Sequence, residues 1–354
     1  MTLSEFYSIW NTPSPTLLVH TSGSTGKPKP LWVEKRRMMA SARATNDFLS
    51  LNPGDTSLLC MPLDYIAGKM VVVRAIERGL DLISVTPSNH PLASAWCTDK
   101  HIDVAAMVPS QVWSSLRVEE EAARLQAIRH IIIGGGAIDS RLEETLRSFP
   151  NAVWSSYGMT ETLSHIAMRR VSGPGASLWY TPMPCVSVSL ASDGCLVIDA
   201  PNVHDGCLKT NDMAEINPDG QRFRIIGRKD NVICSGGIKL HIEDMERKIA
   251  SRIDTPFCIT KRRDEKFGEV AVMLSVAHDI DTAVLSECLR RYEIPKEVIH
   301  VSSIPLTETG KTDRHAALLI AEQEAREKHS HYDNRAITIA LWHLPEMNEI
   351  WAYP

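Results

Sequence analysis

The stretch HTSGSTGKPK, residues 20–29, packs hydroxyl groups, glycines and two lysines into one loop, directly after a predicted strand over residues 16–20. Glycine lets backbone N–H groups approach an anion closely, and hydroxyl groups add donors for phosphate oxygens. The spacing excludes a Walker A loop, because only two residues separate Gly23 from Gly26 and Pro28 follows Lys27. A flexible surface loop is the plain alternative, but the density of donors after a strand favours phosphate binding.

Outward from this loop, short apolar runs alternate with helical patterns, which predicts an α/β fold. Residues 131–133 form an apolar run typical of a buried strand and lead into three glycines at 134–136. Asp139 or Ser140 can cap the helix that follows. A further helix is expected over residues 70–78, before a glycine that can end it.

The pattern of elements also predicts the domain organisation. Residues 180–227 carry short strands punctuated by glycine and proline, which indicates a smaller β unit. A new helix and strands follow after residue 229. We therefore expect a large domain over residues 1–228, a small domain over residues 229–325, and a tail over residues 326–354 to which the sequence gives no role.

Composition narrows the class of protein. The chain has 354 residues, which suits two or three domains and a sizeable core, and 44% hydrophobic residues, which excludes wholesale disorder. A net charge of −5 gives no general attraction to nucleic acid or to anionic membranes. No apolar run approaches the roughly 18 residues that span a bilayer. We expect neither nucleic acid nor membrane as a partner.

Cysteine usage and the first residues indicate the compartment. The eight cysteines are scattered and include no C-x-x-C pair, which disfavours a zinc site and a disulfide framework. The first ten residues lack the basic and then apolar pattern of a signal peptide. These observations predict a cytoplasmic protein with reduced cysteines and without a structural metal.

The string YGMTET, residues 157–162, carries groups that suit a nucleotide. Tyr157 can stack on a purine, and Thr160 can bond a phosphoryl oxygen. Glu161 can hold Mg²⁺ together with phosphate oxygens. Taken alone, the string could also be an ordinary end of a strand.

Three later segments, residues 210–212, 226–237 and 307–314, complete a series of five stations. Asp212 and Arg228 can both reach a ribose, Ser235 is followed by two glycines that permit a tight turn, and Lys311 lies in a glycine-flanked loop where a cation can neutralise a transferring group. Each has a plain alternative, namely a turn, a solvated linker or a surface lysine. Each segment could be explained separately, but all five in this order favour a nucleotide-binding site.

In this order the five stations resemble the adenylate-forming superfamily, which includes acyl- and aryl-CoA ligases and non-ribosomal adenylation domains. The resemblance runs from about residue 17 to residue 314. Residues 157–167 (YGMTETLSHIA), residues 61–63 (MPL) and the compact size are most similar to the o-succinylbenzoate–CoA ligases of menaquinone biosynthesis. The implied fold is a large N-terminal adenylate-forming domain, here N-terminally shortened, with a small mobile α+β C-terminal domain.

The resemblance implies an AMP-forming ligase that joins a small carboxylic acid to CoA, with ATP and Mg²⁺. The acid would first be adenylated, with Thr160, Glu161 and Lys311 as catalytic residues and Glu161 at the metal, and then transferred to the CoA thiol. Asp230 would be the hinge between the domains. The residues implied in binding ATP and CoA are Thr21, Ser22, Gly23, Ser24, Thr25, Gly26, Lys27, Gly134, Gly135, Gly136, Ala137, Tyr157, Gly158, Met159, Asp212, Arg228, Ser235, Gly236 and Gly237.

Some features depart from the family pattern or leave alternatives open. The phosphate loop begins at residue 21, whereas relatives carry a longer segment before it, so either this is a minimal form or a partner completes the core. Tyr65 stands where many relatives carry His, and Lys69 and His165 are weak candidates for binding a second substrate carboxylate. Another acyl- or aryl-CoA ligase, a non-catalytic nucleotide-binding protein of this fold and a carrier-loading module remain alternatives, and a homo-oligomer is left open.

Overall fold

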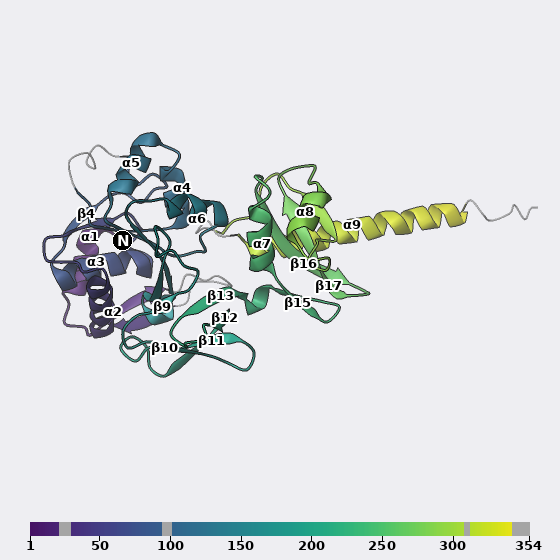
Figure 1. Ribbon diagram of the computed structural model, residues 1–354. Coiled ribbons are helices and arrows are strands. Elements are labelled where there is room, and N and C mark those ends of the chain that lie inside the picture. The colour runs from purple at the N-terminus through teal and green to yellow at the C-terminus, as the bar shows by residue number, and fades with distance from the viewer. Residues whose placement is uncertain (21–29, 94–100, 308–311, 342–354) are drawn as a thin grey trace, which may run out of the picture. The chain divides into compact units, whose positions relative to one another are not determined.

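The computed structural model describes residues 1–20, 30–93, 101–307 and 312–341, with the backbone alone for Thr282 and for 328–341. The chain divides into two compact units, Met1–Asp230 and Asn231–Pro354. In Figure 1 the first unit runs from purple to teal and the second from green to yellow. The expected boundary at residues 228/229 lies two residues before this division, and the mobility of the second unit stays a prediction.

A seven-stranded sheet forms the centre of the first unit. Its strand order is β4-β3-β5-β6-β7-β8-β9, and the strands from β4 to β7 are parallel, whereas β8 and β9 are antiparallel to their neighbours. The carboxyl ends of β5, β6 and β7 therefore meet at one edge, where ligands bind in open α/β sheets. The strands are β3 (Thr56–Leu59), β4 (Asp81–Ser84), β5 (Val104–Met107), β6 (His130–Ile133), β7 (Ala152–Gly158), β8 (His165–Arg170) and β9 (Thr181–Pro182).

The helices of the first unit cover this sheet, and α3 is the most deeply placed of them. Every residue of α3 from Gly68 to Ala75 is buried, including Lys69 and Arg74. The helix ends at Gly79, whose φ of +68° is the left-handed conformation that favours glycine. The helices are α1 (Leu3–Trp10), α2 (Lys35–Phe48), α3 (Ile66–Arg78), α4 (Pro109–Ser115), α5 (Glu119–Ala127) and α6 (Ser140–Arg147).

Two smaller sheets complete the first unit. One is a hairpin of β1 (Thr16–His20) and β2 (Pro30–Glu34). The other is an antiparallel sheet of β10 (Ser187–Leu190), β11 (Cys195–Asp199), β12 (Cys207–Ile216) and β13 (Phe223–Arg228). Phe223 of β13 is fully buried, and its ring stacks on that of Tyr180 with centroids 5.6 Å apart.

The second unit has its own sheet and core. Its strands are β14 (Val232–Ser235), β15 (Ile238–His241), β16 (Phe257–Asp264), β17 (Gly268–Ser275) and β18 (Glu297–His300), and its helices are α7 (Ile242–Ala250), α8 (Thr282–Cys288) and α9 (Arg314–Leu341). Arg314 opens α9 and donates to both carboxylate oxygens of Glu246 at 2.6 Å. Ile233, Met245, Ile259 and Met273 form the centre of the core.

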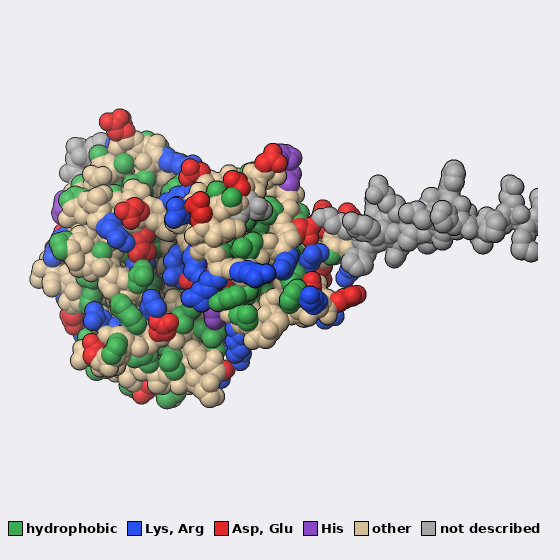
Figure 2. All heavy atoms as spheres, turned by 45° about the vertical axis from the view of Figure 1, so that its right-hand side comes forward, with side chains coloured by type: hydrophobic (Ala, Val, Ile, Leu, Met, Phe, Trp, Pro, Cys, Tyr) green, Lys and Arg blue, Asp and Glu red, His purple; other side chains and the backbone are tan. Residues whose placement is uncertain are grey.

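The structure confirms the α/β fold and refines its elements. The strand expected over residues 16–20 is β1, whereas α3 begins at Ile66, four residues before the expected start. Helix α9 runs on to Leu341 and so extends into the expected tail. Among the described residues, no helix is long and apolar enough to cross a membrane. Figure 2 shows acidic, basic and hydrophobic side chains interspersed on one face.

Candidate active site

The loop after β6 lies close against the end of β7. A Cβ atom on Gly134 would lie 2.6 Å from Ser156 Oγ, and Gly135 has a φ of +79°. Gly134 N–H donates to Met107 O of β5 at 3.1 Å. Side chains at these positions would separate the loop from the strands. The expected adenine-pocket residues, Gly134, Gly135, Gly136 and Ala137, therefore lie at the carboxyl edge of the parallel strands.

The turn after β7 needs a glycine at its start. A Cβ atom on Gly158 would lie 2.2 Å from Ser164 O and 2.5 Å from His165 Cα, because β8 folds back over β7 at this point. A change of register between Tyr157 and Gly158 accompanies this close approach. The backbone of β8 thus begins in contact with the end of β7.

The rest of this turn holds its polar residues in defined places. Thr160–Thr162 forms a 3₁₀ turn, and Met159 N–H donates to Thr162 Oγ1 at 3.0 Å. Leu163 closes the turn with a φ of +64°, which is uncommon for a residue other than glycine. Thr160 is buried, whereas Glu161 is exposed. The Glu161 carboxylate is therefore accessible to a cation from solvent.

Three of the expected nucleotide residues are linked in one cluster. The Tyr157 hydroxyl donates to Asp212 Oδ2 at 2.6 Å, which connects β7 to β12. Asp212 is paired in register with Arg228 of β13, and its Oδ1 lies 3.7 Å from Arg228 Nη1. Arg228 Nη2 donates to Asp230 Oδ2 at 3.2 Å. The structure thus brings Tyr157, Asp212, Arg228 and Asp230 together.

Burial fixes the protonation state of the tyrosine in this cluster. The pKa of Tyr157 is raised above its usual value, first by burial and then by the negative charge of Asp212. The ring also contacts Phe223 edge-on, with centroids 5.3 Å apart. The phenol therefore remains a hydrogen-bond donor to Asp212 at neutral pH.

A second chain of polar contacts lies between α2, α3 and β8. Arg74 Nη2 donates to Ser164 Oγ at 2.5 Å, and Ser164 Oγ lies 3.4 Å from His165 Nδ1. His165 Nε2 lies 2.9 Å from Thr45 Oγ1, which donates to Ser41 O at 3.1 Å. Since the Thr45 hydrogen points to Ser41, the proton of His165 belongs on Nε2, and Nδ1 accepts from Ser164.

Burial keeps the histidine of this chain neutral. The pKa of His165 lies well below its usual value, first because the ring is buried and second because of the charge of Arg74. Every donor in the chain therefore runs in one direction, from Arg74 toward Ser41. The positive end of the chain lies at Arg74.

Arg74 is a buried cation for which the described residues provide no ion pair. Its side chain is 6% exposed, burial lowers its pKa to about 10, and its Nε finds no hydrogen-bond partner in the described part of the chain. The equally buried Arg169 instead donates to both oxygens of Glu143, at 2.9 and 2.7 Å. A buried charge without a partner is costly, so an anionic ligand is the natural complement of Arg74.

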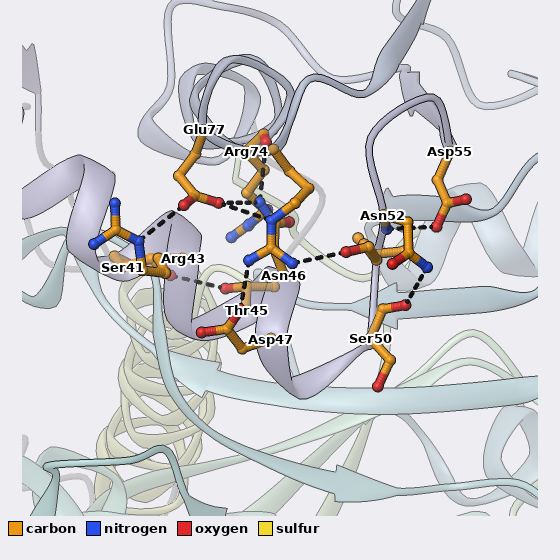
Figure 3. A network of polar contacts seen from close by, with 12 residues as sticks. Ser41, Arg43, Thr45, Asn46, Asp47, Ser50, Asn52, Asp55, Arg74 and Glu77 are labelled. Atoms are coloured by element: carbon orange, nitrogen blue, oxygen red, sulfur yellow. Dashed lines mark hydrogen bonds and ion pairs between the residues drawn. The ribbon is translucent and has the colours of Figure 1, made fainter.

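Helix α2 holds the backbone around Arg74 in place. Asn46 Nδ2 donates to Arg74 O at 3.0 Å and to Glu77 Oε2 at 2.9 Å. Arg43 Nε donates to Glu77 Oε1 at 2.9 Å. Figure 3 shows these side chains converging between the two helices. The nearest acidic residue along α3 is therefore bound to Arg43 and Asn46, and no carboxylate of the described residues pairs with Arg74.

Sequence reasoning missed Arg74 and named Tyr65, Lys69 and His165 instead. Tyr65 immediately precedes α3 and is 38% exposed. The Lys69 ammonium donates to Leu63 O and, at 3.1 Å, to Asp64 O, and burial lowers its pKa. Lys69 thus supports the loop before α3. Of these three residues, only His165 belongs to the chain of contacts that includes Arg74.

The other expected residues lie apart from these clusters or outside the described residues. Ser235, Gly236 and Gly237 form a tight turn in the second unit, where Gly236 N–H donates to Phe267 O at 2.8 Å. The expected phosphate loop, residues 21–27, and Lys311 lie outside the described residues. Their roles stay predictions.

A Mg²⁺ ion fits this donor set only as a companion of phosphate. No group of three or more metal-binding side chains occurs in the described residues. One accessible carboxylate, Glu161, together with phosphate oxygens and water is a common environment for Mg²⁺.

Comparison with known proteins identifies the family of this chain. The profile of a family described as AMP-binding enzyme matches residues 8–205. A 2-succinylbenzoate–CoA ligase of Listeria monocytogenes is 24% identical over 338 residues, which are 88% of this chain and 71% of the relative. The enzyme of the same name from Bacillus cereus is 23% identical over 86% of this chain and 70% of the relative.

Solved structures extend the likeness to the fold. An acyl-CoA synthetase (AMP-forming)/AMP-acid ligase II-like protein from Dyadobacter fermentans is 33% identical, with a TM-score of 0.61 over 88% of this chain and 91% of that protein. The o-succinylbenzoate coenzyme A synthetase of Bacillus subtilis with ATP and magnesium has a TM-score of 0.71 at 22% identity, over 84% and 68% of the two chains, and shows the fold alone. The profile match over more than half of the chain, the Dyadobacter relative and the shared fold show that this protein belongs to the AMP-binding enzyme family, within the adenylate-forming superfamily.

Proposed function

We propose that this protein is an ATP-dependent, AMP-forming acid–CoA ligase, and that its acid is o-succinylbenzoate. The family supports the ligase chemistry, and the names of the curated relatives support the acid. On this proposal the enzyme works in the cytoplasm, where ATP and CoA are available, and its product feeds menaquinone biosynthesis.

The buried Arg74, which has no carboxylate partner among the described residues, is the observation that carries the choice of acid. o-Succinylbenzoate has two carboxylates, and only the aliphatic one is activated. The aromatic carboxylate needs a cation and a hydroxyl donor inside the protein. Arg74 supplies the cation and Ser164 lies within hydrogen-bond distance of it. A monocarboxylic acid would leave this buried charge uncompensated.

In the first step, the acid carboxylate attacks the ATP α-phosphate, forms the acyl-adenylate and displaces pyrophosphate. Residues 21–27 would hold the β- and γ-phosphates, the backbone of residues 134–137 would line the adenine, and Tyr157 would stack on it. Asp212 and Arg228 would bind the ribose. Thr160 would contact the α-phosphate, where negative charge develops, and Lys311 would neutralise that charge.

Glu161 would hold Mg²⁺ with the phosphates, and the ion supplies charge neutralisation when it is bound. In the second step the CoA thiol attacks the acyl carbonyl, forms the thioester and releases AMP. The turn at Ser235, Gly236 and Gly237 would then line the path of the pantetheine arm. On this proposal the second unit presents Lys311 in the first step and this turn in the second.

An exchange assay tests the proposal directly. Acid-dependent exchange of labelled pyrophosphate into ATP is measured with o-succinylbenzoate, with the analogue that lacks the aromatic carboxylate, and with benzoate and fatty acids. We expect exchange with o-succinylbenzoate and much weaker exchange with the analogue. Absence of exchange with every acid would contradict the ligase proposal, and equal exchange with both compounds would contradict the choice of acid.

Two variants test which residue binds the aromatic carboxylate of the acid. Arg74→Met should raise the KM for o-succinylbenzoate by about 10- to 100-fold, because a charge-assisted hydrogen bond is lost. With the analogue that lacks the aromatic carboxylate, Arg74→Met should have the same KM as the wild type. Lys69→Met is the matched control, since Lys69 lies in the same helix and is also buried. If Lys69→Met raised the KM for the acid more than Arg74→Met does, Lys69 rather than Arg74 would bind the aromatic carboxylate.

A further inference from the structure

The polar chain between α2 and β8 includes a serine hydroxyl that has a single hydrogen to donate. Ser164 Oγ accepts from Arg74 Nη2 at 2.5 Å and lies 3.4 Å from His165 Nδ1. Because Nδ1 of the neutral ring is an acceptor here, the Ser164 hydrogen points to the histidine. In this arrangement Arg74 offers its charge to an anion, but Ser164 has no hydrogen left for one.

Ser164 is nevertheless the member of this chain that a ligand reaches. Its side chain is half-buried, whereas the other four members are buried, namely Arg74, His165, Thr45 and Ser41. A hydroxyl hydrogen rotates about the C–O bond and takes the direction that its partners favour. The direction of the Ser164 hydrogen therefore depends on which nitrogen of His165 carries the proton.

A second arrangement of the hydrogens fits the same positions of the heavy atoms. In it the His165 proton lies on Nδ1 and is donated to Ser164, and Thr45 donates to Nε2 across 2.9 Å. The bond that is given up joins Thr45 Oγ1 to Ser41 O within α2, at 3.1 Å (Figure 3). Ser164 then accepts from both Arg74 and His165, and its own hydrogen is free. Both arrangements hold the same number of protons and carry the same charge.

The number of hydrogen bonds decides between the two arrangements. The first has four bonds inside the protein and the second has three, so the protein without a ligand favours the first. A carboxylate beside Ser164 restores the fourth bond. Since a hydrogen bond to a charged acceptor is stronger than one to a neutral carbonyl, an anionic ligand favours the second arrangement.

Burial favours a move of the ring proton over the gain of a second one. The pKa of His165 lies well below its usual value, first because the ring is buried and second because of the charge of Arg74. An imidazolium at His165 would place two cations in one buried cluster. The neutral ring therefore responds to a ligand by changing its tautomer.

We propose that His165 and Thr45 are positioning residues that turn the Ser164 hydroxyl toward a carboxylate of the acid, by moving the ring proton from Nε2 to Nδ1 when the acid binds. The inference rests on the proposed function, in which Arg74 binds that carboxylate. Both positioning residues act through Ser164, and neither touches the acid. This role differs from the one expected from the sequence, which placed His165 itself at the carboxylate.

The position of the ring proton tests the inference without turnover. Isotope-labelled histidine in the full chain distinguishes the two tautomers by nuclear magnetic resonance, and His165→Gln identifies the signal. We expect Nε2–H in the protein alone. Saturating o-succinylbenzoate, with an ATP analogue that cannot be cleaved between its α- and β-phosphates, should raise the Nδ1–H population by about fivefold or more. The analogue of the acid that lacks the aromatic carboxylate should leave the proton on Nε2.

Two substitutions at Thr45 separate this role from a structural one. Thr45→Val removes the hydroxyl and the two bonds that favour Nε2–H, so the free variant should already carry the proton on Nδ1, where Ser164 accepts it. Its Kd for the acid, measured by calorimetry, should fall by about two- to tenfold, because the rearrangement no longer accompanies binding. Thr45→Ser keeps the hydroxyl and should restore the wild-type tautomer and its response to the acid. A purely structural role would raise the Kd in Thr45→Val.

The outcomes separate this inference from the proposed function. The same tautomer with and without the acid, Nδ1–H in the free wild type, or Nε2–H in free Thr45→Val would each overturn the inference. If o-succinylbenzoate supports pyrophosphate exchange and the proton does not move, the proposed function stands and the inference falls. If the proton moves on binding and no acid supports exchange, the role of His165 stands and the ligase proposal falls.

Discussion

Tyr157 of β7 donates its phenolic hydrogen to Asp212 of β12 across 2.6 Å and so joins the seven-stranded sheet to the four-stranded sheet. The two residues lie 55 positions apart in the sequence. The contact orients the Asp212 carboxylate and holds the Tyr157 ring at the same time. A ligand that stacks on this ring and bonds this carboxylate would meet both groups already aligned.

Tyr157→Phe removes the hydroxyl and keeps the ring. We expect the Kd for ATP to rise by about 5- to 50-fold, because a hydrogen bond to a charged group is lost and Asp212 is no longer oriented. Titration calorimetry with ATP measures this change. Tyr180→Phe is the matched control, since its hydroxyl bonds Ser155 Oγ at 2.8 Å and does not reach Asp212. Equal losses in the two variants would show that the Asp212 contact has no special role.

The two buried arginines should respond oppositely to the same substitution. Arg74→Met removes a buried charge that pairs with no carboxylate in the described part of the chain, and we expect the free protein to be unchanged or stabilised by about 1–3 kcal/mol. Arg169→Met leaves Glu143 without its bidentate partner, and we expect destabilisation by about 3 kcal/mol. Urea unfolding of the free proteins measures both. A strong destabilisation by Arg74→Met would mean that Arg74 stabilises the fold, and it would contradict a role for Arg74 in binding an anionic ligand.

Two histidines, the buried His165 and the half-buried His130, should make the fold sensitive to acid. Burial, followed by the charge of Arg129, lowers the pKa of His130 to about 4, and the pKa of His165 is lowered well below its usual value. Both rings are neutral in the fold but bind a proton near pH 6.5 when unfolded. Their stabilisation is therefore complete above pH 6.5 and is lost as the pH falls toward 4, by about 1.4 kcal/mol per pH unit for each ring.

The slope of stability against pH measures this contribution. Replacement of both histidines by Gln should flatten the decline between pH 6.5 and pH 4, whatever the absolute stability of the variant. The exposed His315→Gln is the control and should keep the wild-type slope. An unchanged slope in the double variant would show that other groups cause the acid sensitivity.

Gly158 should not accept even the smallest side chain. A methyl group there would overlap backbone atoms of Ser164 and His165, at 2.2 and 2.5 Å. We expect Gly158→Ala to cost about 2–3 kcal/mol and to displace Thr160. Gly175→Ala is the control, because its Cβ would lie at an ordinary 3.7 Å from Arg170 Cγ. Thermal unfolding compares the two, and similar midpoints would contradict the close approach of β7 and β8.

Much of the sheet could be predicted because its apolar runs are local signals. Residues 131–133 lie in β6, and Asp139 caps α6 by accepting from Arg141 and Leu142 N–H groups at 2.9 and 3.1 Å. By contrast, α2 gave no apolar pattern, because Ser41, Thr45 and Asn46 are among the residues that it buries. Polar side chains become buried there through hydrogen bonds to other elements, which the sequence does not display.

The candidate site could be predicted as a set of residues but not as contacts. The resemblance named Tyr157, Asp212 and Arg228, whereas their arrangement depends on the register of β12 and β13 and on the approach of β7. Arg74 was missed because a charged residue in a helix normally faces solvent. It is buried here because α3 is enclosed over two of its turns, a tertiary effect without a local signature.

The turn at Gly158 separates two sets of polar contacts along one hairpin. Tyr157, before the turn, faces Asp212, and His165, after it, belongs to the chain of contacts that ends at Arg74. If Arg74 binds the acid and Asp212 binds the nucleotide, as we propose, α3 and the start of β8 could be varied to change the acid while β7, β12 and β13 are left unchanged. On the same proposal, mutations on one side of the turn would change the acid that is accepted and would leave the nucleotide-binding side in place.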